Sequence, residues 1–330
     1  METVKPSFYD AFRCLAGSCP DSCCHEWEVD VDENTAEMYW SLPSPLGDKL
    51  RRVLRKEEGT YAMTIENRRC PMWRQDGLCE IQAQLGHDAL CRTCQAFPRL
   101  RHDYGAYVEL GLELSCPEAA RLIFADYTLI SQTQAGGELT CDEVWFRLLA
   151  ESRKEALRFL ETSDMPIGKT LAALLLYACW VQSALDGDAL LPPDWERGVQ
   201  QAEEFAQAGD MGGFYDFFLG LEILTPRWEA KLQARPQNGA LDERLRALMK
   251  YFICRYWLQA VADGDLTVRV KFMVISCLLV NALGGDMVTN AQLFSKEIEN
   301  SPENMAAILD AAYSHSAFTD RKLWGLLLKK

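Results

Sequence analysis

The sequence predicts a mainly α protein, in which a small, cysteine-rich α+β head over residues 1–120 precedes a multi-helix α body over residues 121–330. Nine of the thirteen cysteines fall within the first 116 residues. Apolar and polar residues alternate strictly over 107–114, which is typical of a strand, and from residue 118 onward the apolar period is about 3.6, which is typical of helices. With 330 residues, 48% of them hydrophobic, the chain can bury one large core or two ordinary ones.

The first elements of the head are short. Residues 27–32 alternate apolar and acidic side chains, which favours a strand. Asp32 or Asn34 is a suitable N-cap for a helix that ends before Pro43. A second helix is expected over about 46–56 and a second strand over 60–65.

The middle of the head contains a tight turn and two short helices. Cys70 and Cys79 flank the turn, which an Asp-Gly pair marks. A helix over 79–85 is expected to end at a glycine, and the next, over 89–97, is expected to end at the following proline. Two cysteines three residues apart on that second helix point the same way.

The body shows the helical period repeatedly, without an internal repeat of fixed length. The last but one of these segments begins with a Ser-Pro-Glu-Asn sequence, which supplies a cap and a first-turn proline. The expected helical segments are 119–130, 144–160, 170–185, 195–206, 214–224, 241–262, 268–283, 291–298 and 305–313.

Charge and composition narrow the class of protein. The formal net charge is −14 and the pI is near 4.9, whereas a protein that binds nucleic acid normally carries a net positive charge. This charge either keeps the protein soluble or favours a basic, lysine-presenting partner. Residues 1–10 lack the apolar stretch of a secretory signal, and the longest apolar runs are too short to span a membrane. We therefore expect a cytoplasmic protein with no membrane or nucleic-acid partner.

The clustered cysteines predict an inorganic centre. In a reducing compartment such a cluster favours metal or redox work over disulfides. Thiolates are soft ligands that suit zinc and iron–sulfur clusters, although no single stretch has the zinc-finger spacing of two close pairs. The other four cysteines lie singly on apolar helix faces, as buried thiols do. Because nine thiols exceed the needs of one cluster, an individual member of the nine is alternatively an ordinary buried thiol. The candidate ligands are Cys14, Cys19, Cys23, Cys24, Cys70, Cys79, Cys91, Cys94 and Cys116.

Further candidates surround these cysteines. His25 is a candidate ligand or proton carrier beside the Cys23-Cys24 pair, whereas His87 is expected at a helix junction, where it does not face Cys91. Arginines concentrate near the cysteine motifs, where they are candidates for binding the carboxylate of a cofactor or balancing thiolate charge: Arg68, Arg69, Arg92, Arg99 and Arg101. Four aromatic residues are candidates for lining a pocket that binds a cationic group, with packing in the core as the alternative: Trp27, Trp73, Tyr104 and Tyr107.

Several motifs between about residues 8 and 124 resemble the flagellin lysine-N-methylase family. They are Phe12-Arg13-Cys14, Cys19-Pro20-Asp21-Ser22-Cys23-Cys24-His25-Glu26-Trp27, Cys70-Pro71, Asp76-Gly77-Leu78-Cys79-Glu80-Ile81, Leu85-Gly86, Cys91-x2-Cys94, Phe97-Pro98-Arg99 and Ser115-Cys116-Pro117-Glu118-Ala119-Ala120. The close cysteines that end in a Cys-Cys pair also resemble a cysteine-rich family of zinc or iron chelators.

The resemblance implies methyl transfer from S-adenosylmethionine to lysine side chains of flagellin. It also implies a cysteine-bound iron–sulfur cluster, expected to be of the 4Fe-4S type, with zinc as the alternative. Glu26 stands where a third cysteine would complete the signature of radical S-adenosylmethionine enzymes, so the role of the cluster stays open. None of the glycine pairs follows a predicted strand and opens a helix, which argues against a Rossmann-type donor site.

Two other functions fit the same residues. The chain is either a non-catalytic zinc- or iron-binding protein whose helical body docks a partner, or an iron–sulfur electron carrier. The long helical body argues mildly against a carrier, which needs little beyond its cluster.

Overall fold

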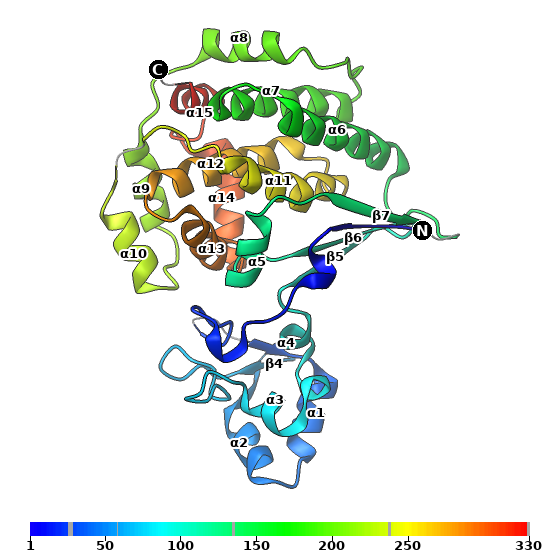
Figure 1. The fold of residues 1–330 in the computed structure, drawn as a ribbon, viewed down its shortest axis with the longest axis vertical. Coiled ribbons are helices and arrows are strands. Elements are labelled where there is room, and N and C mark those ends of the chain that lie inside the picture. Colours follow the sequence, from blue (N-terminus) through cyan, green and yellow to red (C-terminus); the bar gives the residue numbers. More distant parts are fainter. Residues whose placement is uncertain (26–28, 58, 134–135, 237–238, 329–330) are drawn as a thin grey trace.

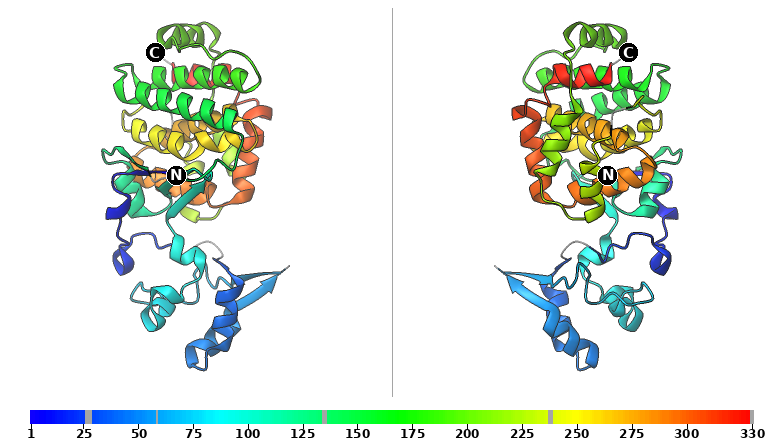
Figure 2. Two further views of the ribbon diagram at one scale, coloured as in Figure 1. Left: turned by 90° about the vertical axis from the view of Figure 1, so that its right-hand side faces the viewer. Right: turned by 90° about the vertical axis from the view of Figure 1, so that its left-hand side faces the viewer.

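The computed structural model describes residues 1–25, 29–57, 59–133, 136–236 and 239–328. The chain forms two lobes, and all three ribbon views show the smaller lobe projecting from one end of the larger (Figures 1 and 2). Each lobe has its own cluster of buried apolar side chains. The cluster of the smaller lobe draws on residues between 29 and 91, so we call residues 14–98 the head and the rest the body.

The head is built on an antiparallel sheet of β2 (Val29–Val31), β4 (Thr60–Met63) and β3 (Leu54–Glu57), in that order within the described ranges. Between β2 and β3 lie α1 (Glu33–Ser41) and α2 (Pro45–Val53). The side chains of Asp32 and Ser44 cap these two helices by accepting hydrogen bonds from backbone N–H groups. The predicted helix over 46–56 was too long, because its last residues leave the helix to pair with β4.

A second sheet joins the two ends of the predicted head to the body. It contains β5 (Arg99–Asp103), β6 (Tyr107–Leu112), β1 (Glu2–Pro6) and β7 (Leu129–Thr133), in that order among the described residues. β1 runs parallel to β6 and antiparallel to β7. The chain therefore leaves the body after β1, forms the head and returns through β5.

Several helices of the body stack above this sheet and others lie beside it (Figure 1). Asp142, Asp194, Asp265, Asp286 and Ser301 each cap the start of a helix through a side-chain oxygen. The helices are α5 (Pro117–Ile123), α6 (Glu143–Thr162), α7 (Ile167–Leu185), α8 (Trp195–Phe205), α9 (Met211–Leu219), α10 (Pro226–Gln233), α11 (Leu245–Tyr256), α12 (Leu266–Ala282), α13 (Met287–Ile298), α14 (Pro302–Ser314) and α15 (Asp320–Leu327).

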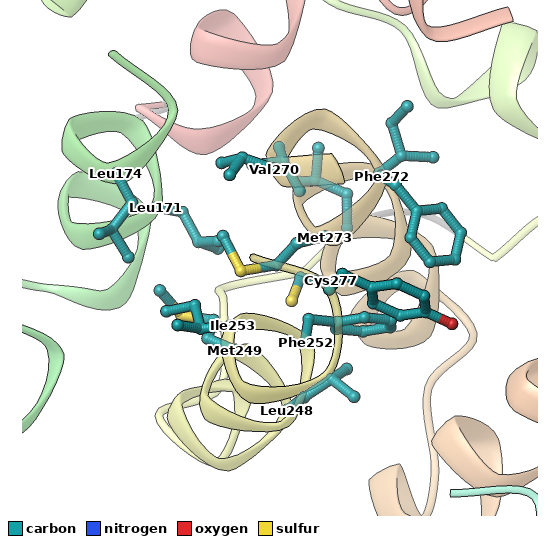
Figure 3. Close-up of a cluster of buried hydrophobic side chains, with 14 of the residues drawn as sticks. Leu171, Leu174, Leu248, Met249, Phe252, Ile253, Val270, Phe272, Met273 and Cys277 are labelled. Atoms are coloured by element: carbon teal, nitrogen blue, oxygen red, sulfur yellow. The ribbon is translucent and has the colours of Figure 1, made fainter. Parts of the chain in front are cut away.

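The centre of the body is the contact between α7, α11 and α12. Figure 3 shows Leu171 and Leu174 of α7 facing Met249 and Ile253 of α11, with Met273 of α12 between them. All five side chains are at most 1% exposed. Because α7, α11 and α12 pack against one another and against further helices, they bury apolar side chains on several faces. This burial explains the long apolar runs in their sequences.

Among the described residues, α7 is the one helix long and apolar enough to cross a membrane, and 67% of its most apolar window is buried inside the fold. It contacts α6, α8, α12 and α15. Its composition is therefore that of a central core helix.

The predicted fold class, mainly α with an α+β head, is confirmed. The expected strands at 60–65 and 107–114 are present as β4 and β6, and β2 covers the described end of the segment 27–32. The helix expected over 119–130 ends instead at Ile123, because the residues from Leu129 pair with β1. The strands β1, β3, β5 and β7 and the helices α10 and α15 had no clear sequence signal.

The two buried clusters do not divide at residue 120, the boundary between head and body that the sequence predicted. Phe12, Leu112 and Cys116 belong to the body cluster, because β6 and α5 pack against the helices. The buried side chain of Glu109 on β6 also pairs with buried Arg153 on α6. The head is therefore an excursion from the body.

Candidate functional site

A cavity of about 440 Å³ lies where the head meets the body. All nine cysteines of the predicted ligand set are among the described residues, and seven of them line this cavity. The other two, Cys70 and Cys91, are buried in the head cluster. The seven are Cys14, Cys19, Cys23, Cys24, Cys79, Cys94 and Cys116.

Short local structures place these thiols. Cys14 and Cys19 flank the single 3-10 turn Ala16–Ser18. Cys79, Cys91 and Cys116 are the N-cap residues of α3 (Glu80–Leu85), α4 (Arg92–Ala96) and α5. Their sulfur atoms thus lie at helix starts. Burial raises the pKa of Cys79 and of Cys116, and the backbone N–H groups of the helix starts offset only part of this rise. The helix predicted over 89–97 begins later than expected, so Cys91 precedes it and Cys94 lies within it.

The thiols influence one another at two contacts. The Cys23 and Cys24 thiols share a hydrogen bond, which lowers the pKa of Cys24 and raises that of Cys23. Cys91 and Cys94 make the same kind of pair, in which the pKa of Cys91 is lowered and that of Cys94 raised. In each pair one thiol is therefore prepared to lose its proton, as a metal ligand must.

The body holds the cysteine loop through one buried helix. On α13, the Lys296 ammonium lies 2.6 Å from a carboxylate oxygen of Asp21, and its side chain is 1% exposed. Gln292, also on α13, donates to the other oxygen of Asp21 at 2.9 Å and to the backbone carbonyl of Ser115 at 2.7 Å. Asp21 lies between Cys19 and Cys23, and Ser115 precedes Cys116, so α13 positions both sides of the cavity.

Sequence reasoning missed this anchor. Lys296 and Gln292 lie in a segment identified only as apolar helix, and α13 buries Asn290, Ser295 and Glu297 as well. Buried polar side chains need partners, so their presence within an apolar stripe was the available signal. It could not reveal that the partner was 275 residues away.

The five candidate arginines, all in described segments, are placed differently from one another. Arg101 pairs with Asp103 on β5 and does not line the cavity. Arg99 lines the cavity, where its guanidinium lies 5.2 Å from the centre of the Phe12 ring. Arg68 donates to the backbone carbonyl of Leu224, between head and body. Arg69 lies over the Trp73 ring, and Arg92 is an exposed side chain near Asp32; neither lines the cavity.

Other candidates are also located. His25 packs edge-on against Trp73, with 4.6 Å between the ring centres. Tyr104 and Tyr107 pack against Phe146 in the body, which is the core-packing alternative. The prediction for Trp27 lies outside the described residues.

Two cavity residues were not assigned to it from the sequence. Arg13 lines the cavity beside Cys14. His87 was expected not to face Cys91 from a helix junction; it lies in the short 3-10 helix His87–Ala89 and lines the cavity.

The donor chemistry of the cavity suits a soft metal or an iron–sulfur cluster. All thirteen cysteines are described and none forms a disulfide. In this arrangement, no group of three or more His, Cys, Asp or Glu side chains among the described residues lies close enough to hold a metal ion. A metal centre would therefore have to draw the sulfur atoms closer together.

Another, much smaller cavity of about 50 Å³ lies between the body sheet and α11. This space suits a few water molecules and is too small for a cofactor. The cysteine-lined cavity is therefore the better candidate for a functional site.

The chain is similar to three proteins of known name. It is 31% identical over 130 residues to the flagellar biosynthetic protein FliU of Salmonella muenchen, and the match covers 37% of this chain and 77% of FliU. It has the same identity over the same length to the lysine-N-methylases of Salmonella typhimurium strain LT2 and Salmonella choleraesuis strain SC-B67. These matches span only about a third, 32%, of those two proteins.

No family model and no solved structure matches the chain. The similarity to FliU covers more than two-thirds of that protein at more than 30% identity. The chain therefore belongs to the flagellin lysine-N-methylase family.

Proposed function

We propose that this protein is a cytoplasmic protein-lysine N-methyltransferase that transfers methyl groups from S-adenosylmethionine to lysine side chains of flagellin. Two relatives are named lysine-N-methylases and the third is named a flagellar biosynthetic protein. The structural observation that carries the proposal is the cavity at the junction of head and body, where seven cysteines and Arg99 meet.

The reaction requires the lysine amine in its neutral form. The nitrogen lone pair attacks the methyl carbon of the sulfonium, the C–N bond forms as the C–S bond breaks, and S-adenosylhomocysteine leaves. The substituted ammonium then releases a proton to solvent. The net charge of −14 attracts a lysine-rich surface to the protein before this step.

Residues of the cavity supply groups for holding the donor. Arg99 and Arg13 both line it, and a guanidinium matches the carboxylate of S-adenosylmethionine in charge and shape. The volume of about 440 Å³ lies within the range of small-molecule sites. The cavity thus has room and charge for one donor molecule or for an inorganic centre beside part of it.

The cysteines fit the iron–sulfur cluster that the family resemblance implies, because they are soft donors drawn from separate segments. The cavity-lining thiols are the ones that would hold it. When bound, such a cluster would supply electron transfer or, at an iron without a thiolate ligand, a Lewis acid for the donor's polar groups. Zinc is the alternative centre.

Methyl transfer can be tested with the anaerobically purified chain, flagellin and S-adenosylmethionine carrying a labelled methyl group. We expect label on flagellin lysines, and a loss of tenfold or more in the transfer rate for Arg99→Ala. Arg92→Ala is the matched control, since Arg92 is 78% exposed outside the cavity, and it should transfer at the normal rate. No label with any lysine-rich substrate would instead favour a metal-binding protein or an electron carrier.

The inorganic centre needs a separate readout. Cys19→Ala and Cys23→Ala should remove the brown colour and bound sulfide of an iron–sulfur protein. Cys141→Ala, outside the ligand set, should leave both unchanged. If the two cavity variants keep colour and sulfide, the cluster is held elsewhere.

A further inference from the structure

Methyl transfer to lysine needs a group that takes a proton from the substrate. A lysine side chain in water has a pKa of about 10.4, so at neutral pH nearly all of it is ammonium, which has no lone pair to attack a methyl group. An acceptor for this proton must reach the cavity where the donor binds. Apart from the cysteines, three described side chains that line the cavity can accept a proton: Asp21, His87 and Glu118.

The two carboxylates of the cavity are already held by cations. Asp21 accepts hydrogen bonds from Lys296 at 2.6 Å and from Gln292 at 2.9 Å, one on each oxygen. Glu118 accepts two hydrogen bonds from the Arg121 guanidinium, at 2.7 and 2.8 Å, and these lower the pKa of the carboxyl. A carboxylate that a cation stabilises is a weak base, so neither suits the removal of a proton from an ammonium.

The imidazole of His87 is placed differently. Its side chain is 57% exposed, and its ring makes no hydrogen bond to another described residue. A neutral imidazole has one nitrogen that accepts a proton, and it is the usual general base of enzymes. The Asp88 carboxylate lies 3.8 Å from Nδ1 of the ring, where it attracts a cationic substrate side chain. His87 is therefore the cavity residue best suited to receive the proton.

The turn that carries this imidazole is fixed by hydrogen bonds to its backbone. The Tyr39 hydroxyl donates to the carbonyl of Ala89 at 2.7 Å, and the Gln95 side-chain amide donates to that of Asp88 at 3.1 Å. Both carbonyls belong to the 3-10 helix His87–Ala89. The imidazole thus starts from a defined position on the cavity wall.

The cavity receives basic side chains from the body and this imidazole from the head. Arg99 begins β5 and Arg13 follows a residue of the body cluster, whereas His87 follows α3 of the head (Figure 1). The guanidinium groups match the carboxylate of the donor but repel a lysine ammonium. The substrate lysine is therefore favoured on the head side, beside His87 and Asp88.

We propose that His87 is the general base of methyl transfer, taking the proton from the ammonium of the substrate lysine. This proposal rests on the proposed function and names a catalytic residue for it. The N–H bond of the ammonium breaks, and an N–H bond forms on the imidazole. The amine lone pair then attacks the methyl carbon of the sulfonium, and S-adenosylhomocysteine leaves with the electron pair of the C–S bond. The exposed imidazolium returns its proton to solvent.

The first test compares kcat and KM for labelled methyl transfer to flagellin. His87→Ala should lower kcat on the order of 10²-fold at pH 7 and change KM less than about twofold, because proton removal and not binding is lost. His87→Asn should show the same loss with a polar side chain in place. Gln84→Ala is the matched control, since Gln84 is exposed on α3 and does not line the cavity.

An added base gives a sharper test. Free imidazole in the assay should restore at least about tenfold of the lost rate to His87→Ala, since the substitution leaves room for the missing ring. It should leave the rates of the wild type and of Arg99→Ala unchanged, because Arg99 is proposed to hold the donor and not to move the proton. Failure of imidazole to restore any rate would contradict the assignment of a base.

The pH profile gives an independent readout. The transfer rate of His87→Ala should rise about tenfold per pH unit towards the lysine pKa near 10.4, whereas the wild-type rate should level off at lower pH. Few other charges face the ring in the described structure. Besides Asp88, α3 packs against this turn, and its one charged residue, Glu80, is paired with Lys49 at 2.6 Å. Parallel profiles would contradict the proposal.

The metal content distinguishes a base from a ligand. His87→Ala should keep the iron, zinc and sulfide of the wild type, and loss of any of them would overturn the proposal by making His87 a ligand of the inorganic centre. A normal transfer rate for His87→Ala would refute His87 as the base and leave the proposed function standing. If the wild type transfers no methyl group to any lysine-rich substrate, the proposed function fails, and this role of His87 fails with it.

Discussion

The two lobes of the molecule are held together by different means. In the body, 14 of the 17 residues of α12 are buried, and the structure describes all 17. In the head, α1 is also fully described, and buries only Ala36 and Tyr39. The body therefore draws its stability from apolar burial, whereas the head has a small core surrounded by thiols. The comparison teaches that the head has little apolar burial of its own, so its contacts with the body, such as those of Asp21 with α13, matter more to it.

Removal of metal should have the largest effect and should separate the lobes most clearly. Binding of zinc to thiolate sites contributes on the order of 10–16 kcal/mol at neutral pH, which exceeds the usual stability of a small domain. After chelation, limited proteolysis should cut residues 14–98 at least about tenfold faster, while the body stays resistant. Unchanged cleavage of the head would contradict this difference between the lobes.

A cavity in the body core should have the next largest effect. Phe252 on α11 is 2% exposed and packs edge-on against Phe272 of α12 (Figure 3). Phe252→Ala should lower the free energy of unfolding by about 3–5 kcal/mol, measured by urea denaturation, with the metal content of the folded fraction unchanged. Val144→Ala is the control, because Val144 is 74% exposed and should change stability by less than about 0.5 kcal/mol.

The anchor between the lobes can be broken at α13. Lys296→Met leaves Asp21 without its ammonium partner, and breaking such a buried pair costs about 3 kcal/mol. Faster proteolysis between Cys14 and Cys24 should report it. Lys169→Met removes an exposed ion pair with Glu203 and should cost less than about 1 kcal/mol. In the double variant Lys296→Met, Asp21→Asn, removal of the unpaired charge should restore part of the stability that Lys296→Met loses. If the single and double variants lose the same stability, the loss comes from altered packing and not from the ion pair.

The smallest expected effect is a pH dependence in α13. Burial raises the pKa of Glu297 to about 7, and its Oε1 makes no hydrogen bond within the described ranges. The folded protein keeps this proton to higher pH than the unfolded chain, so stability falls as pH rises from about 4.5 through 7. Between pH 5 and pH 8 the wild type should lose about 2 kcal/mol more than Glu297→Gln, in urea denaturation at each pH. Parallel pH profiles would show that Glu297 does not retain the proton.

Short-range patterns predicted a large part of this architecture. The strict alternation over 107–114 marked β6, and the two candidate caps, Asp32 and Asn34, marked the start of α1, where the structure uses Asp32. The strands β1 and β5 escaped notice, because Glu2–Pro6 is too short to show a period and Arg99–Asp103 is mostly polar. Their pairing depends on β6, which is about 100 residues from β1 in sequence.

In the candidate site, too, the sequence predicted local features and missed those that depend on contacts between distant residues. The nine cysteines were recognised because their density at one end of the chain is a local property of the sequence. Their surroundings were not, since Cys70 and Cys91 are buried in the head cluster whereas the other seven line the cavity. Likewise, the five arginines near the cysteines looked alike in the sequence, but Arg99 lines the cavity whereas Arg92 is exposed away from it.

The sequence by itself determined the chemistry of this protein: soft thiol donors at one end, an acidic surface and helices with continuous apolar faces. These properties depend on residue type and on spacings of a few residues. Only the tertiary structure decided which thiols lie together and that Lys296 and Gln292 hold Asp21. Contacts across 270 residues depend on the packing of two lobes, which no local pattern encodes.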